Sequence, residues 1–255
     1  KISFNSLNKL RGWWTSLTAM DANQDGRLDL VAGNWGRNHE RGDSSFQPLR
    51  IYYGAASGQG GYPSVESHWD QDRAAFVPSR DWGTLSASLP WLNRAFKTFQ
   101  TFAHASMEEA LQTIPGEFQF LEARCFESIV FLNLESTWKA IPLPDEAQIS
   151  PLFGIGIGDF NNDGMEDLVG SQNFFGVNAL DSRQDAGMGL LLFGNGDGTF
   201  TASLPASSGI AIRGEGRGLA VADFDHDGRA DFIATQHSGP TKLYRNLEQK
   251  VGLAV

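Results

Sequence analysis

The 255-residue sequence predicts an all-β fold, a β-propeller of about four blade equivalents with a two-helix insertion. Three observations support this fold. A nine-residue acidic loop occurs three times, short apolar strands flank each copy, and a second type of hairpin alternates with the loop-bearing hairpins. A repeated unit of two hairpins is typical of a propeller blade. We expect a single domain over residues 1–255, partial or an excerpt of a larger ring, with the helices at about 82–115.

The repeated loop has the pattern D-x-[DN]-x-D-G-x-x-D. Oxygen-bearing side chains at positions 1, 3, 5 and 9 suit a hard cation, because Ca²⁺ takes about six to eight oxygen ligands. Glycine at position 6 allows a sharp turn, and position 7 would add its backbone carbonyl. We expect three Ca²⁺ sites with these ligands: Asp21, Asn23, Asp25, Arg27 and Asp29 in loop 1; Asp159, Asn161, Asp163, Met165 and Asp167 in loop 2; Asp223, Asp225, Asp227, Arg229 and Asp231 in loop 3. Loop 3 carries four carboxylates, so we expect it to bind most tightly.

The flanking residues distinguish these loops from EF-hands. Period-two alternation precedes each loop and a short apolar run follows it, which predicts a strand, a loop and a second strand. An EF-hand loop lies between helices and is closed by a glutamate at position 12. Position 12 is occupied here by Ala32, Gly170 and Ala234. Each loop is therefore predicted to be the turn of a β-hairpin, with position 9 supplying the fourth side-chain oxygen.

Residues 54–63 occupy the place of a fourth loop, between predicted strands at 49–53 and 65–69. The positions equivalent to the ligands hold no carboxylate, and we expect this blade to have lost its metal. They are Ala55, Ser57, Gln59 and Pro63.

The stretch from 82 to 115 departs from the β pattern. Leucine and phenylalanine at three- and four-residue spacing predict an amphipathic helix. Ser106 and Glu109 predict a capping box at the start of a second helix that ends near Thr113. The insertion either caps one end of the β domain or shapes a partner surface. Hairpins are predicted again at 128–142 and 189–202, and residues 242–246 resemble the strand at 49–53.

The charge balance limits the partners. A net charge of −10 argues against nucleic acid as a partner, which requires clustered Lys and Arg. Ten of the thirty acidic residues are loop aspartates, and three Ca²⁺ ions would leave a net charge of about −4. No run of eighteen apolar residues occurs, so no membrane insertion is expected. Loops of this kind fill where calcium is millimolar, so we expect an extracytoplasmic protein: secreted, periplasmic or at the cell surface.

Catalytic signatures are absent from the sequence. It contains no H-E-x-x-H, G-x-S-x-G or P-loop motif, and its five histidines lack metal-ligand spacing. We interpret Cys125 as a small buried side chain, and His226, at position 4 of loop 3, as a solvated residue. Trp35 and the pair Phe174-Phe175 would allow sugar stacking at equivalent strand ends, and Arg41-Gly42-Asp43 is interpreted as coincidence. We therefore expect no enzyme activity in this chain.

The three loops and their strands resemble FG-GAP/VCBS repeats, which form the integrin-α-like β-propellers. More narrowly, the chain resembles bacterial relatives of cartilage acidic protein, in which an ASPIC/UnbV domain follows the repeats. The segments that carry this resemblance are RGWW at 11–14, DLVAGNWGRN at 29–38, RDWGTLSASLPWLNRAFKTF at 80–99, PDEAQISP at 144–151, GLLLFGNGDGTF at 189–200 and TKLYRN at 241–246.

The resemblance implies a calcium-binding, non-enzymatic propeller that binds a protein or a glycan, in adhesion or as an assembly scaffold. It also implies further propeller blades or an ASPIC/UnbV domain as partners. An alternative stays open, in which the chain is the propeller portion of a secreted carbohydrate- or lipid-active enzyme whose catalytic residues lie outside this chain.

Overall fold

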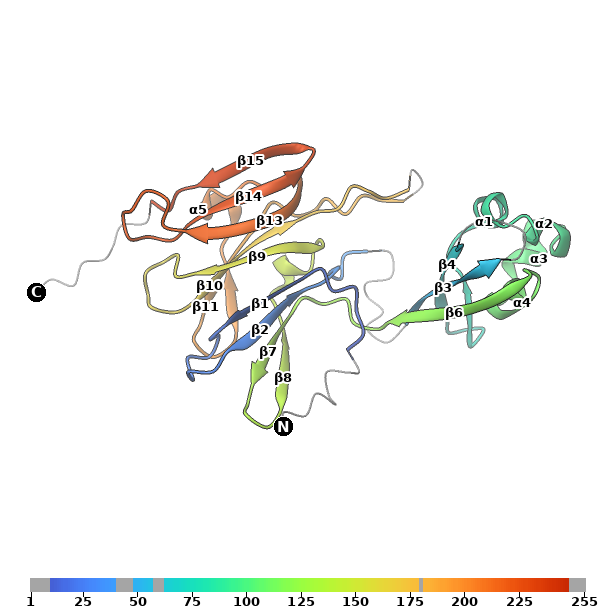
Figure 1. Cartoon of the computed structure of the whole chain (residues 1–255), viewed down its shortest axis with the longest axis horizontal. Helices are drawn as coiled ribbons and strands as arrows, with labels where there is room; N and C mark the ends of the chain where they lie inside the picture. The colour runs from blue at the N-terminus through green and yellow to red at the C-terminus, as the bar shows by residue number, and fades with distance from the viewer. Residues whose placement is uncertain (1–9, 40–47, 57–61, 179–180, 248–255) are drawn as a thin grey trace, which may run out of the picture. The chain divides into compact units, whose positions relative to one another are not determined.

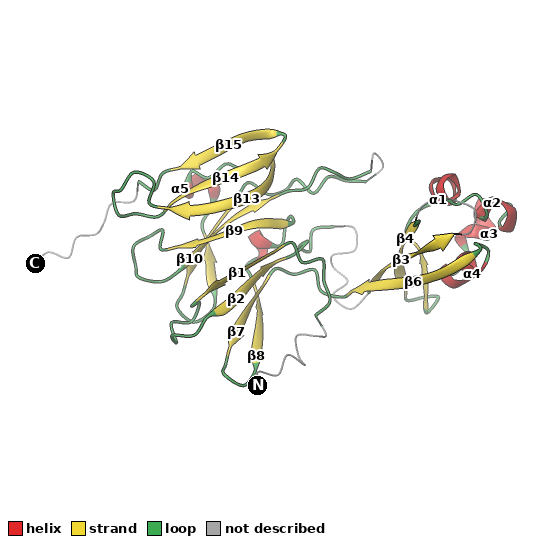
Figure 2. Cartoon of the chain, viewed as in Figure 1, coloured by secondary structure: helices red, strands yellow, loops and turns green. Residues whose placement is uncertain are grey.

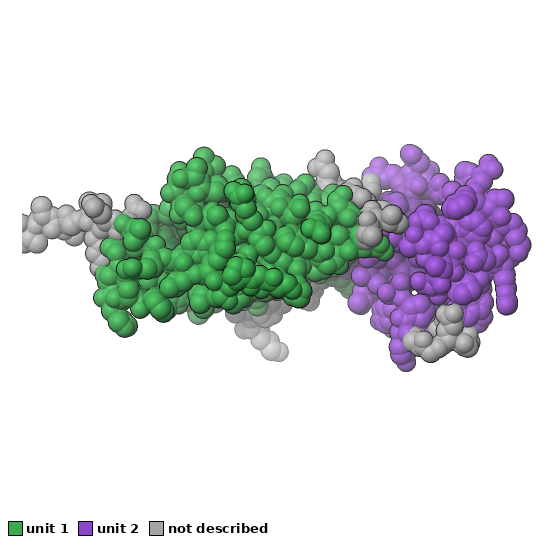
Figure 3. Space-filling view, turned by 90° about the horizontal axis from the view of Figure 1, so that it is seen from above, with its two compact units in different colours: residues 1–43, 125–255 green, residues 44–124 purple. Residues whose placement is uncertain are grey.

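The computed structural model describes residues 10–39, 48–56, 62–178 and 181–247 (Figure 1). The chain divides into two compact units. Unit 1 consists of residues 1–43 and 125–255, and unit 2 of residues 44–124 (Figure 3). The predicted all-β, propeller-like architecture is confirmed, with four antiparallel sheets. Where the sequence predicts one domain with an insertion at about 82–115, the structure shows a longer insertion that forms a unit of its own.

The described residues of unit 1 form three sheets, which we call blades 1, 2 and 3. Blade 1 has the strand order β1 (Ser16–Met20), β2 (Asp29–Gly33), β7 (Ile129–Asn133) and β8 (Trp138–Pro142). Blade 2 consists of β9 (Leu152–Gly158), β10 (Asp167–Gln172), β11 (Leu190–Gly194) and β12 (Phe200–Ala202). The described strands of blade 3 are β13 (Glu215–Ala222), β14 (Asp231–His237) and β15 (Gly239–Tyr244). The short helices η2 (Asp145–Ala147) and α5 (Pro205–Ser208) lie in connections of this unit.

Apolar side chains fill the space between successive blades. One buried cluster joins blades 1 and 2 and includes Val31, Val130 and Leu192, and another joins blades 2 and 3 and includes Val169 and Phe232. All six residues of β10, the second strand of the middle blade, are buried. Leu168 of this strand belongs to the first cluster and Val169 to the second, so its two faces pack against different blades. The blades are therefore stacked face to face.

Glycine permits the close approach of β9 and β13. A Cβ atom at Gly156 would overlap the side chains of Leu219 and Val221. Gly154 and Gly158, the other alternating glycines before loop 2, likewise lie close to β13 or its neighbour, so these glycines are packing residues.

The insertion of unit 2 explains the irregular spacing of the loops. Strand β2 pairs directly with β7, for example Val31 with Val130, so unit 2 interrupts blade 1 between its second and third strands. Loops 1 and 2 begin 138 residues apart, and removal of the 81 residues of unit 2 leaves 57, comparable to the 64 between loops 2 and 3.

The expected fourth blade around residues 54–63 is not formed as predicted. The two strands exist, as β3 (Leu49–Ala56) and β4 (Ser64–Asp70), but they belong to the sheet of unit 2. Of the four positions compared with metal ligands, Ser57 and Gln59 lie outside the described residues, as does Arg41-Gly42-Asp43. Strand periodicity was predicted correctly, but it does not determine which sheet a strand joins.

Unit 2 is a four-stranded sheet with helices on one face (Figure 2). The strand order is β5-β4-β3-β6, where β5 is Ala75–Pro78 and β6 is Gly116–Ala123. Its helices are α1 (Trp82–Ser88), α2 (Leu92–Ala95), α3 (Phe99–Ala103) and α4 (Met107–Gln112). Tyr52, Val65 and Phe76 from the sheet pack with apolar residues of the helices in one core cluster.

The helical segment contains four short helices where two were predicted. Pro90 separates α1 from α2, because proline lacks an amide donor and disfavours helical backbone at the preceding residue. Leu89 accordingly leaves the helical region, with φ −127° and ψ 77°. The capping box is confirmed at the start of α4, where the amide of Ser106 donates to Glu109 at 2.8 Å and the amide of Glu109 donates to Ser106 Oγ at 3.1 Å. None of the helices in the described ranges has the length and apolar character that a membrane crossing requires.

Replacement of residues 44–124 by a short Gly/Ser linker should leave unit 1 folded. The amide of Gly36 donates to the carbonyl of Phe126 at 2.7 Å, so the chain leaves and re-enters unit 1 at neighbouring residues. Circular dichroism and thermal melting should show retained β structure and one cooperative transition. Loss of the cooperative transition would show that unit 1 needs unit 2 to fold.

Cys125 should resist alkylation in the folded protein. Burial raises the pKa of its thiol to about 11, and the residue packs with Ile129 and Phe131. At pH 8 roughly one thiol in a thousand is then ionised. Mass spectrometry after iodoacetamide treatment should show modification in urea and almost none in buffer. Rapid modification of the native protein would contradict the buried position.

Candidate metal centres

The three acidic loops leave their blades at the same end of unit 1 (Figure 1). Each joins the first two strands of a blade, as predicted, and the backbone follows the same course in all three. Left-handed backbone occurs at positions 4 and 6: φ is 57°, 59° and 61° at Gln24, Asn162 and His226, and 81°, 84° and 81° at Gly26, Gly164 and Gly228. A Cβ atom at Gly26 or Gly164 would meet nothing within 4 Å, so the backbone angle, not space, requires glycine there.

The position 1 aspartate closes each loop through two backbone amides. In loop 1, Asp21 accepts from the amides of Asp25 at 3.0 Å and Gly26 at 2.9 Å. Asp159 and Asp223 make the equivalent bonds, with distances from 2.9 to 3.2 Å. These bonds fix the carboxylate over the loop interior.

The position 5 aspartate is fixed in the same way by the amide of position 7. The distances are 2.9 Å in loop 1, 2.8 Å in loop 2 and 3.0 Å in loop 3. In loops 1 and 2, the asparagine at position 3 also donates to the position 5 carboxylate, at 2.9 Å and 2.8 Å. Positions 1, 3 and 5 are therefore brought together, as the sequence predicts.

Loop 3 has the largest concentration of negative charge. Carboxylate oxygens of Asp223, Asp225 and Asp227 lie within 4.8 Å of one another. Oδ1 of Asp225 is buried and has no hydrogen-bond partner in the described part of the chain, and the other oxygen of this residue pairs with Arg245. A buried carboxylate oxygen without a donor is costly unless a cation lies near it. The donor set of this loop therefore fits a hard cation.

The position 9 aspartate has a function that the sequence did not indicate. Asp29, Asp167 and Asp231 are almost completely buried, with 0%, 0% and 1% of their surface exposed. One oxygen of each accepts from the amide of position 2 in its own loop, at 2.8–3.1 Å. The other oxygen accepts from the amide of Asn133, Gly194 or Asn246, at 2.7–2.9 Å. Each aspartate thus ties its loop to the third strand of the same blade, and its additional role as a fourth metal ligand stays a prediction.

Burial perturbs two of these carboxyl groups. It raises the pKa of Asp29, and it raises the pKa of Asp167 to about 6 against the opposing effect of the two amides bound to it. A nearby divalent cation would lower the pKa of these carboxyl groups, because it favours the ionised carboxylate.

The arginine at position 7 connects the position 5 carboxylate to the third strand. Nε of Arg27 donates to the carbonyl of Asn133 at 2.9 Å, and Nε of Arg229 donates to that of Asn246 at 2.7 Å. The same guanidinium groups pair with the position 5 aspartates. Loop 2 has Met165 at this position, so its position 5 carboxylate has no equivalent arginine.

Adjacent loops and blades are also joined by hydrogen bonds. The amide of Asp21 donates to Glu166 Oε2 of loop 2 at 2.6 Å. The position 2 carbonyls accept from the next blade: Ala22 from the amide of Gly198 at 3.0 Å, and Phe160 from Nδ2 of Asn246 at 2.8 Å. Sequence reasoning missed Glu166 and Asn246 in this role, because the loop pattern contains only local positions.

Of the aromatic residues considered for sugar stacking, Trp35 and Phe174 pack against each other, and Arg183 lies over Phe175. The rings of Trp35 and Phe174 lie 5.1 Å apart, and Trp13 contacts Trp35 edge-on at 5.4 Å. Arg217 lies over Phe153, 4.1 Å from the ring centroid. His226 is exposed, in line with its interpretation as a solvated residue.

Residues 159–234 match the FG-GAP-like repeat family. The match begins at the first residue of loop 2, continues through β10 to β13 and loop 3, and ends in β14. No curated protein matches the chain. An FG-GAP-like repeat is therefore present, and it coincides with two of the three acidic loops.

Substitution of alanine for Asp167 should destabilise the protein even without metal. The change leaves the buried amides of Phe160 and Gly194 without an acceptor, at a cost of about 1–3 kcal/mol each. Urea unfolding in EDTA should show this loss, while Asp185→Ala at an exposed site should change the free energy of unfolding by less than about 0.5 kcal/mol. Equal stability of the two variants would contradict the structural role of position 9.

Proposed function

We propose that unit 1 is a calcium-binding, non-enzymatic propeller module that serves as an extracytoplasmic scaffold for binding a protein or a glycan. The observation that carries the proposal is the crowding of three carboxylates in loop 3, where Asp225 Oδ1 is buried and has no hydrogen-bond partner among the described residues. The same backbone conformation in loops 1 and 2 extends the proposal to three ions.

The donor chemistry favours Ca²⁺ over other common metals. Positions 1, 3 and 5 offer only carboxylate and amide oxygens, and no cysteine or inward-facing histidine is part of the loops. Zinc and copper prefer sulfur and imidazole, whereas Mg²⁺ demands a regular octahedron and keeps several waters. In each loop, the side chains of positions 1, 3 and 5 and the carbonyl of position 7 would hold the ion. The aspartate at position 9 would complete the set.

Bound calcium would supply positive charge where the blades meet. The loops already link each hairpin to its third strand and, in blades 1 and 2, to the next blade. Neutralisation of the loop carboxylates would remove their mutual repulsion and strengthen these links. The ions then stabilise the scaffold, and ligand binding takes place on surfaces that the loops position.

The FG-GAP-like repeat supports the scaffold role, since the resemblance implies adhesion or assembly. Millimolar calcium outside the cytosol would fill sites of moderate affinity, which supports the extracytoplasmic setting. The narrower resemblance to cartilage-acidic-protein-like proteins adds an ASPIC/UnbV domain or further blades as proposed partners, beside the protein or glycan ligand.

Removal of calcium should lower the melting temperature. A ligand at 100 times its Kd stabilises the folded state by about 2.7 kcal/mol per site, equivalent to roughly 5–10 °C for a chain of this size. Differential scanning calorimetry in EDTA, in 1 mM Ca²⁺ and in 1 mM Mg²⁺ should show the largest increase with calcium. An unchanged melting temperature, with no calcium detected by elemental analysis, would contradict the metal assignment.

Substitution of methionine for Arg229 should tighten calcium binding by loop 3. The change reproduces the position 7 residue of loop 2 and removes the cation that pairs with Asp227. We expect about a three- to tenfold lower Kd in a chelator competition assay, since removal of a competing charge pair is worth about 1 kcal/mol. The exposed Arg213→Met variant is the matched control. Weaker binding by the Arg229 variant alone would show that the arginine supports the site.

A further inference from the structure

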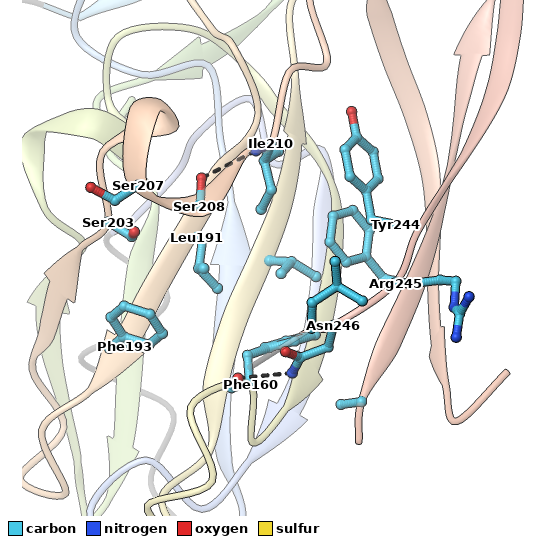
Figure 4. Close-up of a pocket in the computed structure, with 14 residues that line it drawn as sticks. Phe160, Leu191, Phe193, Ser203, Ser207, Ser208, Ile210, Tyr244, Arg245 and Asn246 are labelled. Atoms are coloured by element: carbon cyan, nitrogen blue, oxygen red, sulfur yellow. Dashed lines mark hydrogen bonds between the residues drawn. The ribbon is translucent and has the colours of Figure 1, made fainter. Parts of the chain in front are cut away.

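Unit 1 contains a cavity of about 770 Å³ between blades 2 and 3 (Figure 4). Leu191 and Phe193 of β11 lie on one side and Tyr244 on the other, and Phe160 and Phe232 add aromatic surface. The same five side chains belong to the apolar cluster that joins these two blades or pack against it. This cavity is therefore part of the packing between blades.

Unit 2 contains a smaller cavity of different character. Its volume is about 410 Å³, and it lies beside β5, an edge strand of the sheet. This volume is within the range of small-molecule pockets, about 300–1,000 Å³. The lining includes four charged and two aromatic side chains: Asp70, Arg73, Arg80, Asp81, Trp82 and Phe99. They come from the end of β4, the turn after it, the residues that follow β5, and helices α1 and α3.

Bonds within unit 2 hold the polar side chains in place. The amide of Arg73 donates to Asp70 Oδ1 at 3.2 Å, and Nη1 of Arg73 donates to the carbonyl of Ala103 at 2.6 Å. Asp81 accepts from the amide and the hydroxyl of Thr84, at 3.0 and 2.7 Å. An arginine has five N–H donors and each carboxylate oxygen has two lone pairs, so these side chains keep further hydrogen-bonding capacity for a ligand.

The charges around the cavity largely compensate one another. Arg73 Nε lies 3.3 Å from Asp70 Oδ2, and Arg80 Nη2 lies 3.6 Å from Glu66 Oε2. A charged ligand would compete with these ion pairs and would meet a like charge beside each opposite one. A neutral ligand with several hydroxyl groups can donate to carboxylates and accept from guanidinium groups without breaking either pair.

The aromatic side chains give the cavity an apolar corner. The rings of Trp82 and Phe99 meet edge-on, with their centroids 5.0 Å apart and their planes at 86°. Phe99 is 65% exposed, so much of its apolar surface is open to a ligand. An aromatic ring offers a flat apolar surface, and one face of a sugar ring presents C–H groups that can pack on it. Apolar surface with donors and acceptors beside it is the combination that a sugar ring requires.

We propose that this cavity of unit 2 binds a neutral saccharide, with Phe99 and Trp82 against the sugar ring. Its hydroxyl groups would bond to Asp70, Arg73 and Asp81. The inference rests on the proposed function in that it selects a glycan as the ligand of the scaffold. It places the site in unit 2, however, so no calcium loop is part of it.

Saturation-transfer NMR with the full chain tests the class of ligand. The panel contains neutral oligosaccharides of glucose, galactose, mannose, xylose and N-acetylglucosamine, beside uronic-acid and sulfated saccharides. At least one neutral saccharide should bind, with a Kd on the order of 1 mM for so small a contact. Absence of binding to every neutral saccharide at up to about 10 mM, or binding of the acidic saccharides alone, would overturn the proposal.

Substitutions in the cavity test its position. Phe99→Ala should weaken binding of the saccharide selected by the panel about three- to tenfold, through loss of the aromatic contact. Asp81→Asn keeps a side chain that caps α1 and should weaken binding about fivefold, because a hydrogen bond to a charged acceptor is stronger than one to an amide.

Tyr62→Ala is the matched control, because Tyr62 is a 79% exposed aromatic residue of unit 2 outside the cavity lining. This variant should bind the saccharide as the unmodified protein does, and circular dichroism should show that all three variants are folded. Unchanged affinity in both cavity variants, or an equal loss in Tyr62→Ala, would place the saccharide elsewhere and overturn the proposal.

The calcium-dependent rise in melting temperature separates this inference from the calcium assignment. The rise should be the same in Phe99→Ala as in the unmodified protein, because the loops lie in unit 1. If the rise is present and no neutral saccharide binds, the saccharide site is wrong and the calcium assignment stands. If a neutral saccharide binds in the cavity and calcium has no effect on melting, the saccharide site stands and the calcium assignment is wrong.

Discussion

The buried aspartate at position 9 of each loop is the interaction on which every blade depends. One carboxylate oxygen accepts from a backbone amide at the start of the loop, and the other accepts from a backbone amide at the end of the third strand. The two amides are far apart in the sequence. The bond between Asp29 and Asn133 spans the whole of unit 2, so blade 1 keeps its strand order despite an insertion of 81 residues. A buried amide without an acceptor is costly, and this cost makes the arrangement specific.

The carboxylates of position 9 accept hydrogen bonds at both oxygens, whereas the other loop aspartates concentrate negative charge that is only partly neutralised. Amides fix the carboxylates of positions 1 and 5, and Arg27, Arg229 and Arg245 neutralise some of them. Loop 2 has Met165 in place of such an arginine, and one buried oxygen of Asp225 in loop 3 has no hydrogen-bond donor within the described ranges. The proposed calcium ions would compensate this charge at the points where loops 1 and 2 also contact the following blade.

Local features of the fold could be predicted from the sequence, because they depend on residues near one another in the chain. The three hairpin loops, the hairpins at 128–142 and 189–202, and the Ser106–Glu109 capping box are confirmed. Non-local pairing could not be predicted. Residues 242–246 resemble the strand at 49–53 in sequence, yet their structural equivalent is β7, because the amides of Asn246 and Asn133 each donate to a position 9 aspartate. The hydrogen bond between Glu166 and the amide of Asp21 could not be predicted for the same reason, because the two residues are 145 positions apart.

Hydrogen exchange with and without calcium tests the central claim most directly. If bound ions strengthen the links among hairpin, third strand and next blade, the amides of Asp163, Gly164, Gly194 and Gly198 should gain protection together when calcium is added to the EDTA-treated protein. The same protection at all four amides in EDTA and in calcium would contradict the account, since calcium would then add nothing to the links that the hydrogen bonds already make.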